Sequence, residues 1–280
     1  MKRKTINFLK ISNKLNIVSC ILILVGLGSI YYKGLQPSLD FTGGQTIRAH
    51  YLDKNLSEEV IKTYLGNEIE TEIVVSSIKH KDKSEYINYN SFLIETQFTD
   101  EIKIRDLLKE VSPNFGIKIG EFSKQAPHIG KELAYKTLWA FLAAIIIVGI
   151  YIAIRFDRHY AVGSLIALIH DVIFTLGVLS LFNIQISLAI IAAILTIIGY
   201  SLNDTIVVYD RIRENITKLD SSKKNIVNIS LNQILSRTLI TSLTTLFVVI
   251  VLYFFGGDTL KPFALTLIIG VTIGTYSSIF

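Results

Sequence analysis

Cysteine and proline are scarce in this sequence, and the motifs of common nucleotide-binding and metal-dependent enzymes are missing from it. Its 280 residues include one cysteine, Cys20, and four prolines. A single thiol excludes an intramolecular disulfide and a cysteine-rich metal site. Four prolines with 17 glycines exclude a collagen-like chain. The sequence contains no P-loop, no dinucleotide fingerprint and no His-Glu-x-x-His motif, so we expect no cofactor, no metal site and no enzymatic activity.

Charged residues are also few, and they are unevenly distributed. Half of the chain (50%) is hydrophobic, 18% is charged and the mean hydropathy is +0.48, which is too apolar for a soluble protein. Of the 28 basic and 23 acidic residues, 14 and 16 respectively lie between residues 33 and 136. The rest of the chain is therefore predicted to lie in a membrane. Its basic excess reflects membrane topology, and we expect no nucleic-acid partner.

Six apolar runs are long enough to cross a bilayer, which requires about 20 residues per helix. The first run is long for a secretory signal and no cleavage site follows it, so we expect an uncleaved anchor. The last run stops at Phe280 without a flanking charge, which predicts that the natural chain continues. The predicted spans are residues 15–32, 137–154, 161–182, 186–209, 238–255 and 263–280.

The distribution of Lys and Arg predicts the orientation of these spans. Five basic residues precede the first span, two lie in the 155–160 loop and six lie in the 210–237 segment. Because cytoplasmic loops carry the excess of Lys and Arg, we expect both termini in the cytoplasm. The predicted domains are a basic N-terminus (1–14), a first span (15–32), an external domain with linkers (33–136) and a five-span membrane block (137–280).

The external segment has its own pattern. Its periodicities alternate in the order βαββαβ, which is the split βαβ or ferredoxin-like pattern of a small α+β domain. Ser57 is predicted to cap its first helix and Thr99 its second helix. About 75 residues can build a small core but no large ligand pocket. The predicted elements are strands at 46–51, 70–79, 91–98 and 116–122, helices at 57–65 and 99–111, and a hairpin tip at 81–90.

Asp204 lies near the middle of the fourth predicted span. The twelve Ile, Leu and Val residues of this span favour insertion by roughly 4 to 7 kcal/mol, whereas a central Asp costs about 3 kcal/mol. Such a residue normally faces a bundle interior or water. Asp204 is therefore either a protonatable carrier or a structural carboxylate that is hydrogen-bonded to a neighbouring helix. With Asn203 and Thr205 beside it, the carboxylate could bind either a proton or a sodium ion.

Other polar residues in or near the spans also allow two readings. Arg237 lies at the cytoplasmic mouth of the fifth span, where it either extends toward Asp204 or serves as a flanking positive-inside residue. His170 and Asp171 are predicted near the membrane midplane, where they form either a proton relay or a structural pair that fixes helix packing. Residues 223–237 are predicted to form an amphipathic segment on the cytoplasmic interface.

Several stretches of the sequence resemble one known family. The most specific is residues 199–215, which contains Asn203-Asp204 and ends in Asp210-Arg-Ile-Arg-Glu-Asn215. On these stretches the chain resembles, over essentially its whole length, the SecF family of protein-export membrane subunits, which are of the resistance-nodulation-division type. Ser38 departs from the pattern, because the family usually has glycine there. The matching stretches are residues 40–44 (Asp-Phe-Thr-Gly-Gly), 127–130 (Pro-His-Ile-Gly), 155–157 (Arg-Phe-Asp), 168–171 (Leu-Ile-His-Asp), 199–215 and 236–242.

The resemblance implies a half-transporter in the bacterial cytoplasmic (inner) membrane. SecD would complete a twelve-span bundle, and the proton-motive force would drive late preprotein translocation beside the SecYEG channel. SecD, SecYEG, the preprotein and membrane lipid are therefore the expected partners. The resemblance also implies that Asp204 and Arg237 are proton-pathway residues, to which we add the neighbours Asn203 and Thr205. Asp40, Phe41, Thr42, Gly43 and Gly44 would form a hinge that carries motion outward, or else a tight turn that anchors the domain.

Two other functions stay open at this point. The chain could be a non-motor scaffold that stabilises the translocon, with Asp204 in a structural role. It could also be half of an efflux pump for small molecules, although the external segment has little room for a drug pocket.

Overall fold

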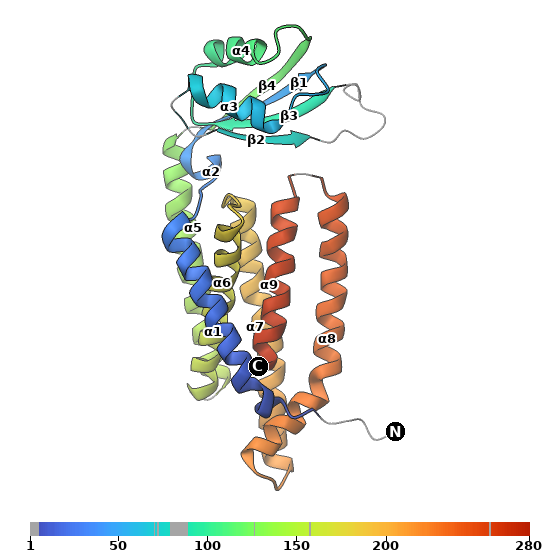
Figure 1. Cartoon of the computed structure of the whole chain (residues 1–280). Helices are drawn as coiled ribbons and strands as arrows, with labels where there is room; N and C mark the ends of the chain where they lie inside the picture. Colours follow the sequence, from blue (N-terminus) through green and yellow to red (C-terminus); the bar gives the residue numbers. More distant parts are fainter. Residues whose placement is uncertain are drawn as a thin grey trace. The chain divides into compact units, whose positions relative to one another are not determined.

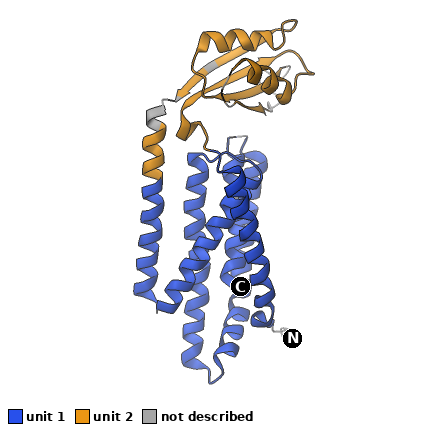
Figure 2. Ribbon diagram, turned by 60° about the vertical axis from the view of Figure 1, so that its left-hand side comes forward, with its two compact units in different colours: residues 1–36, 138–280 blue, residues 37–137 orange. Residues whose placement is uncertain are grey.

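The computed structural model describes residues 6–69, 71, 73–78, 89–125, 127–156, 158–257 and 259–280. The chain divides into two compact units, shown in different colours in Figure 2. The membrane unit comprises residues 1–36 and 138–280, and the α+β unit comprises residues 37–137.

The α+β unit contains a four-stranded sheet and two helices in the predicted order βαββαβ. The strand order is β2-β3-β1-β4 and each neighbouring pair is antiparallel, which confirms the ferredoxin-like pattern. Both helices pack on one face of the sheet (Figure 1). The elements are β1 Gly44–Tyr51, α3 Glu58–Glu68, β2 Ile73–Ile78, β3 Asn90–Thr96, α4 Glu101–Glu110 and β4 Ile117–Gln125.

The core of this unit follows from period-2 strands packed against two amphipathic helices. Ile47, Ala49 and Tyr51 point to one face of β1 and are fully buried, and both helices supply apolar residues at i and i+4 spacing, such as Ile61 and Leu65. The hydroxyl of Tyr51 donates to the Leu108 carbonyl at 2.9 Å. Burial raises the pKa of Tyr51 well above its usual value, so this donor stays protonated.

The helix caps of this unit match the prediction at one position and differ at the other. Ser57 caps α3, as predicted, and its side chain accepts from the Val60 N–H. The prediction of Thr99 as the second cap was wrong, because Asp100 caps α4 and accepts from two backbone N–H groups. A carboxylate suits this position because it also complements the positive end of the helix dipole. The predicted hairpin tip lies, apart from residues 89 and 90, outside the described residues.

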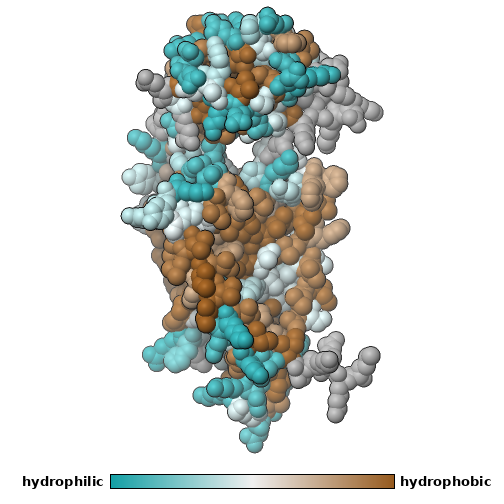
Figure 3. Space-filling model, viewed as in Figure 1, coloured by the Kyte–Doolittle hydropathy of each residue, from teal (hydrophilic) through white to brown (hydrophobic). Residues whose placement is uncertain are grey.

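The membrane unit confirms the predicted six spans, since six helices of the described chain are long and apolar enough to cross a bilayer. The chain is therefore a multi-pass membrane protein. A broad apolar belt covers these helices in Figure 3. On α8, for example, Leu243, Phe247 and Val248 are exposed. The six helices are α1 Phe8–Lys33, α5 Pro127–Arg155, α6 Arg158–Leu181, α7 Leu188–Lys218, α8 Lys223–Phe255 and α9 Lys261–Ile279.

Helix α7 is the most buried span, and it packs against α6, α8 and α9, while α1 packs against α6. Glycines allow these close approaches. A Cβ atom at Gly177 of α6 would lie 2.5 Å from the Cα of Gly26 in α1, and one at Gly270 of α9 would lie 2.0 Å from the Ile197 side chain of α7. Small residues therefore set the spacing between these helices.

The predicted interfacial segment 223–237 does not form an element of its own. It is the first part of α8, which runs without interruption from Lys223 to Phe255. Leu231 and Ile234 are buried against Val208 and Ile212 of α7 and against Phe8 of α1. The prediction was wrong because the apolar side of this segment is covered by protein, so it is not free to face lipid.

Glu95 provides a test of the α+β unit. Its side chain is half-buried on β3, and burial, together with the negative charge of Asp40, raises its pKa above the ordinary 4.5. The folded unit therefore binds this proton more tightly than the unfolded chain, so stability falls as pH rises through 4.5 to the folded-state value.

We expect Glu95→Gln to stabilise the unit at pH 7 and to have little effect at pH 3, because glutamine cannot ionise. Hydrogen exchange of β1 and β3 amides in the full chain, compared with wild type at each pH, measures this difference. Equal exchange in both proteins at pH 7 would show that ionisation of Glu95 does not destabilise the folded unit.

Candidate functional site

Asp204 lies in the second half of α7, about 24 Å from the beginning of that helix. It is 3% exposed. Its Oδ2 atom has no hydrogen-bond partner in the described part of the chain, and neither has the Oγ1 of Thr238 on α8. A buried carboxylate oxygen without a donor is costly in a low-dielectric interior. Binding of a proton or a cation would remove that cost.

A serine beside this carboxyl is hydrogen-bonded to hydroxyl groups of two other helices. Ser242 of α8 lies beside Asp204. The Tyr200 hydroxyl donates to the Ser242 Oγ at 3.3 Å, and the Oγ of Ser242 lies 2.7 Å from the Oγ1 of Thr275 on α9. The polar groups of α7, α8 and α9 therefore converge here, although each hydroxyl already has partners of its own.

Arg237 is the predicted partner of Asp204, and the structure places it nearby without forming a close pair. The guanidinium is near enough to attract the carboxylate electrostatically. No ion pair joins the two residues among those found in the described ranges. The Arg237 side chain is exposed, so it is free to approach or withdraw.

The two residues that flank Asp204 point elsewhere. Asn203 is exposed on the outside of the membrane unit. Thr205 is buried, and its hydroxyl donates to the Ser201 carbonyl of its own helix at 3.0 Å. The three consecutive side chains therefore point in different directions, because successive side chains on a helix diverge by about 100°.

Asp171 of α6 forms a second polar centre, whose partners the sequence did not reveal. Its Oδ2 accepts from the hydroxyls of Ser201 at 2.6 Å and Ser277 at 2.8 Å. Its Oδ1 lies 2.9 Å from the His170 Nδ1, and the His170 Nε2 lies 2.5 Å from the Ser19 Oγ. This carboxylate is 1% exposed, and it connects α1, α6, α7 and α9.

The predicted hinge motif lies in the α+β unit and forms a short helix followed by two special glycines. Helix α2, Leu39–Thr42, is capped by Ser38, whose Oγ accepts from the Asp40 N–H at 3.3 Å. The departure of Ser38 from the family pattern therefore has a structural role. Gly43 and Gly44 both have positive φ angles, of 74° and 138°.

Close packing fixes this turn further. A Cβ atom at Gly44 would lie 2.4 Å from the Thr96 carbonyl oxygen, and one at Gly130 would lie 2.4 Å from the Phe41 carbonyl oxygen. The 40–44 and 127–130 motifs are thus in direct contact. This geometry favours the tight turn over the hinge, and alanine at Gly44 would disturb folding itself.

Charged residues at the end of α7 form surface ion pairs. Asp210 pairs with Arg155 at 3.4 Å, and Glu214 pairs with Arg211 and Lys218. Pairs this exposed contribute little to stability. No cluster of three or more His, Cys, Asp or Glu side chains that could hold a metal occurs within the described ranges.

The Asp171 centre gives a stability prediction. Replacement by leucine would leave the Ser201 hydroxyl and the His170 Nδ1 without their acceptor, whereas the Ser277 hydroxyl would keep the Gly274 carbonyl. Each buried unsatisfied group costs about 1 to 3 kcal/mol, so we expect Asp171→Leu to destabilise the membrane unit by at least about 2 kcal/mol. Asp171→Asn keeps an acceptor oxygen and serves as the milder control. Thermal unfolding in detergent should give a lower melting temperature for Asp171→Leu than for Asp171→Asn. Equal melting temperatures for the two variants would contradict this prediction.

Comparisons with known proteins identify the family. The family model of the C-terminal part of the protein export membrane proteins SecD and SecF matches residues 103–280. The chain is 41% identical to the protein translocase subunit SecF of Calditerrivibrio nitroreducens over 98% of the chain and 90% of that protein. It is 40% identical to the corresponding subunit of Haemophilus influenzae, over 98% and 82% respectively.

Solved structures give the same result. The crystal structure of SecDF, a translocon-associated membrane protein from Thermus thermophilus, superposes with a TM-score of 0.85 at 34% identity. The match covers 99% of this chain and 37% of that one. A super-membrane-facing form of SecDF superposes with a TM-score of 0.72. The chain belongs to the SecD/SecF family of protein-export membrane proteins, as a member of the SecF type.

Proposed function

We propose that the chain works with a SecD partner to convert the proton-motive force into late translocation of preproteins through the SecYEG channel. The relatives are named as translocase subunits, and the solved relative is described as translocon-associated. The observation that carries the proposal is Asp204, a carboxyl within the α7 span that is 3% exposed and has one oxygen without a hydrogen-bond partner among the described residues.

This environment suits a group that alternates between two states. The charged form of Asp204 lacks donors at Oδ2, whereas the protonated form is neutral and carries a donor of its own. Nearby, the buried Thr238 Oγ1 also lacks a partner. One proton crossing 100 mV releases about 2.3 kcal/mol, which is enough to change a two-state population about fiftyfold.

The orientation and the place of action are part of the proposal. The basic residues of the N-terminal and 210–237 segments favour a cytoplasmic location for both termini, by the positive-inside rule. Residues 33–136 would then lie on the external, periplasmic side of a bacterial inner membrane. There the α+β unit would act on emerging preprotein.

An exposed face of α7 supports the SecD partner. Asn203 lies on this face near mid-span, where contact with lipid would be costly. Its exposed neighbours on the helix are small, which would let another helix approach closely. We propose that the SecD half covers this face and completes the twelve-span bundle. The small exposed residues are Ala189, Ala192, Thr196 and Gly199.

The first prediction of this proposal concerns Asp204. We expect Asp204→Asn to keep membrane insertion and SecD association and to lose the gradient-dependent part of export, because asparagine keeps the shape but cannot take up a proton. Export into inverted vesicles, with and without a proton gradient, measures this. Asp210→Asn on the same helix is the matched control, since Asp210 is exposed and paired with Arg155.

The outcomes separate three accounts. Loss with Asp204→Asn but not Asp210→Asn supports the motor. Normal gradient-driven export by Asp204→Asn would leave the chain as a scaffold that stabilises the translocon. Export that follows a sodium gradient in the wild type would replace the proton by sodium as the coupling ion.

The second prediction concerns Arg237. We expect Arg237→Ala to lose most gradient-dependent export and Arg237→Lys to keep part of it, because an ammonium supplies the charge but not the guanidinium geometry. Arg213→Ala is the control, since that residue is also exposed and cytoplasmic in this orientation. The same vesicle assay applies, and equal export by both alanine variants would assign Arg237 to topology alone.

A further inference from the structure

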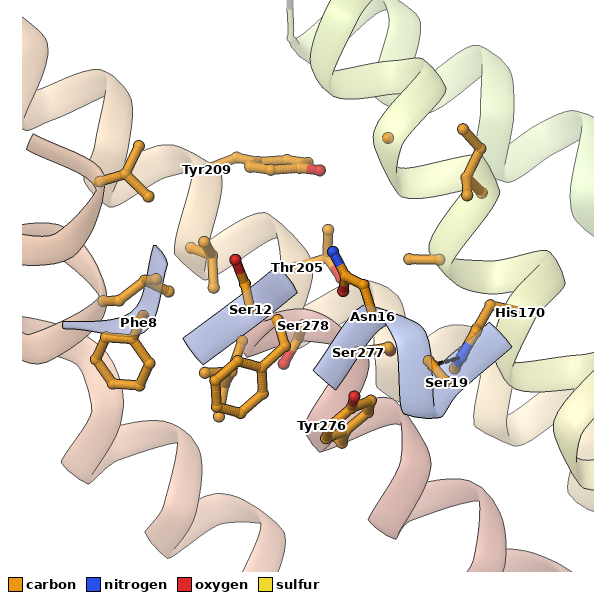
Figure 4. Close-up of a pocket in the computed structure, with 18 of the residues that line it drawn as sticks. Phe8, Ser12, Asn16, Ser19, His170, Thr205, Tyr209, Tyr276, Ser277 and Ser278 are labelled. Carbon is orange, nitrogen blue, oxygen red and sulfur yellow. Dashed lines mark hydrogen bonds between the residues drawn. The ribbon is translucent and has the colours of Figure 1, made fainter. Parts of the chain in front are cut away.

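A cavity of about 490 Å³ lies between α1 and the helices α6, α7, α8 and α9, and we call it the α1 cavity. Figure 4 shows the residues that surround it. Helix α1 is held on both sides of this space. Gly26 packs against Gly177 and Ser29 bonds to Ser180, while the Tyr276 hydroxyl donates to the Leu15 carbonyl.

The wall that α1 presents to the cavity is polar. Ser12, Asn16 and Ser19 follow one another at i, i+4 and i+7, so they share a face, and all three line the cavity. The opposite face carries apolar residues such as Ile17 and Leu24, which are more than half exposed. A peripheral span that turns its polar face inward has a reason to do so if water occupies the space behind it.

The size and chemistry of the α1 cavity favour water as its content. A water molecule takes about 30 Å³ of liquid volume, so the cavity has room for a connected group of waters. Thr205, Ser277 and Ser278 add hydroxyl groups to those of α1. The rest of the lining is largely apolar, so water would be held by the α1 face and by these hydroxyls. Cavities that offer polar partners are normally hydrated, whereas empty ones are lined by apolar groups alone.

His170 connects this cavity to the buried Asp171 centre. It lines the cavity, and its Nδ1 and Nε2 atoms contact Asp171 and Ser19 respectively. The two hydroxyls and the ring that surround Asp171 all suit a carboxylate acceptor, which keeps it charged and places the ring proton on Nδ1. The Nε2 atom is then the basic position, and it faces Ser19 beside the cavity.

Within the described ranges, the ionisable groups near His170 are one carboxyl group and two tyrosines. Asp171 is the charged neighbour from α6, and the cavity receives Tyr209 from α7 and Tyr276 from α9. The lining residues from α1 and α8 carry no ionisable side chain, and no Lys, Arg, Asp or Glu is among the described lining residues.

We propose that the α1 cavity is a hydrated proton-access site and that His170 is the group in it that accepts and releases a proton. A proton from cavity water would reach Nε2 through the Ser19 hydroxyl, which rotates to accept the new N–H. The imidazolium would be balanced by Asp171 through the unchanged Nδ1 hydrogen bond. His170 would then be a second proton-binding residue in addition to Asp204. Only the purpose of this site rests on the proposed function.

Cysteine chemistry tests the hydration of the cavity directly. In the full chain with Cys20→Ala, reconstituted in nanodiscs that expose both membrane faces, Asn16→Cys is compared with Ile17→Cys at the same depth. Only a thiolate attacks the sulfur of a water-soluble methanethiosulfonate and expels its sulfinate, and a thiol ionises readily only where water reaches it. We expect the Asn16→Cys thiol to react about tenfold faster or more. Equally slow reaction at both positions would overturn the hydrated cavity.

The same variant tests His170. The ratio of reaction rates for a cationic and an anionic methanethiosulfonate at Asn16→Cys reports the local charge and is independent of thiol ionisation. As pH falls from 8 to 5, we expect this ratio to drop several-fold, because a protonated His170 repels the cation. His170→Gln in the same background should abolish the drop while the thiol stays reactive.

Two results would overturn the role of His170. One is a cation-to-anion rate ratio that does not change with pH in the Asn16→Cys protein that retains His170. This result can be obtained without a His170 variant. The other is an equal change in His170→Gln. Both readouts are made without transport, so they are independent of whether Asp204→Asn abolishes export. A failure here is therefore distinguishable from a failure of the proposed function.

Discussion

The cost of burying an ionisable side chain among membrane-spanning helices is the constraint on which this structure depends. Among its described residues, the membrane unit buries two carboxylates, Asp171 and Asp204, in different surroundings. Asp171 lies in contact with two serine hydroxyls and a histidine ring nitrogen, so its charge is compensated. Asp204 retains an oxygen with no partner among the described residues. The hydrogen bonds of Asp171 stabilise its charged form, whereas the free oxygen of Asp204 can bind a proton or a cation. This difference separates a packing residue from a candidate carrier more clearly than depth in the membrane does.

The packing of the helices places these two centres close to one another. Helix α9 contacts both, because Ser277 donates to Asp171 while Thr275 reaches Ser242 beside Asp204. Between them, Gly274 lets α9 approach Ser201 of α7, where a Cβ atom would lie 3.1 Å from the serine side chain. A change of charge at either carboxylate would therefore act on the same short stretch of α9. Such close-packed contacts favour discrete alternative arrangements over gradual deformation.

Much of the fold was predictable because it depends on local patterns. Hydropathy alone defined the six spans, and alternating periodicities defined the βαββαβ order. The partners of each buried polar group were not predictable, because they depend on how each helix is rotated against its neighbours. Ser201 donates to Asp171, for example, and nothing in the sequence around Ser201 indicates this partner. Asn203 and Thr205 looked like neighbours of a single site, yet their side chains point away from Asp204. The amphipathic pattern of 223–237 was real, but its apolar side meets α7 rather than lipid.

The central claim is that Asp204 takes up a proton in the membrane while Asp171 stays charged. Infrared difference spectroscopy of the full chain in lipid, recorded between acidic and alkaline pH, measures protonated carboxyl groups directly. The account predicts a protonated-carboxyl band that disappears on alkalinisation, is weaker in Asp204→Asn than in the wild type and keeps its wild-type intensity in Asp171→Asn. Equal intensity in Asp204→Asn and the wild type, or a loss of intensity in Asp171→Asn alone, would contradict it.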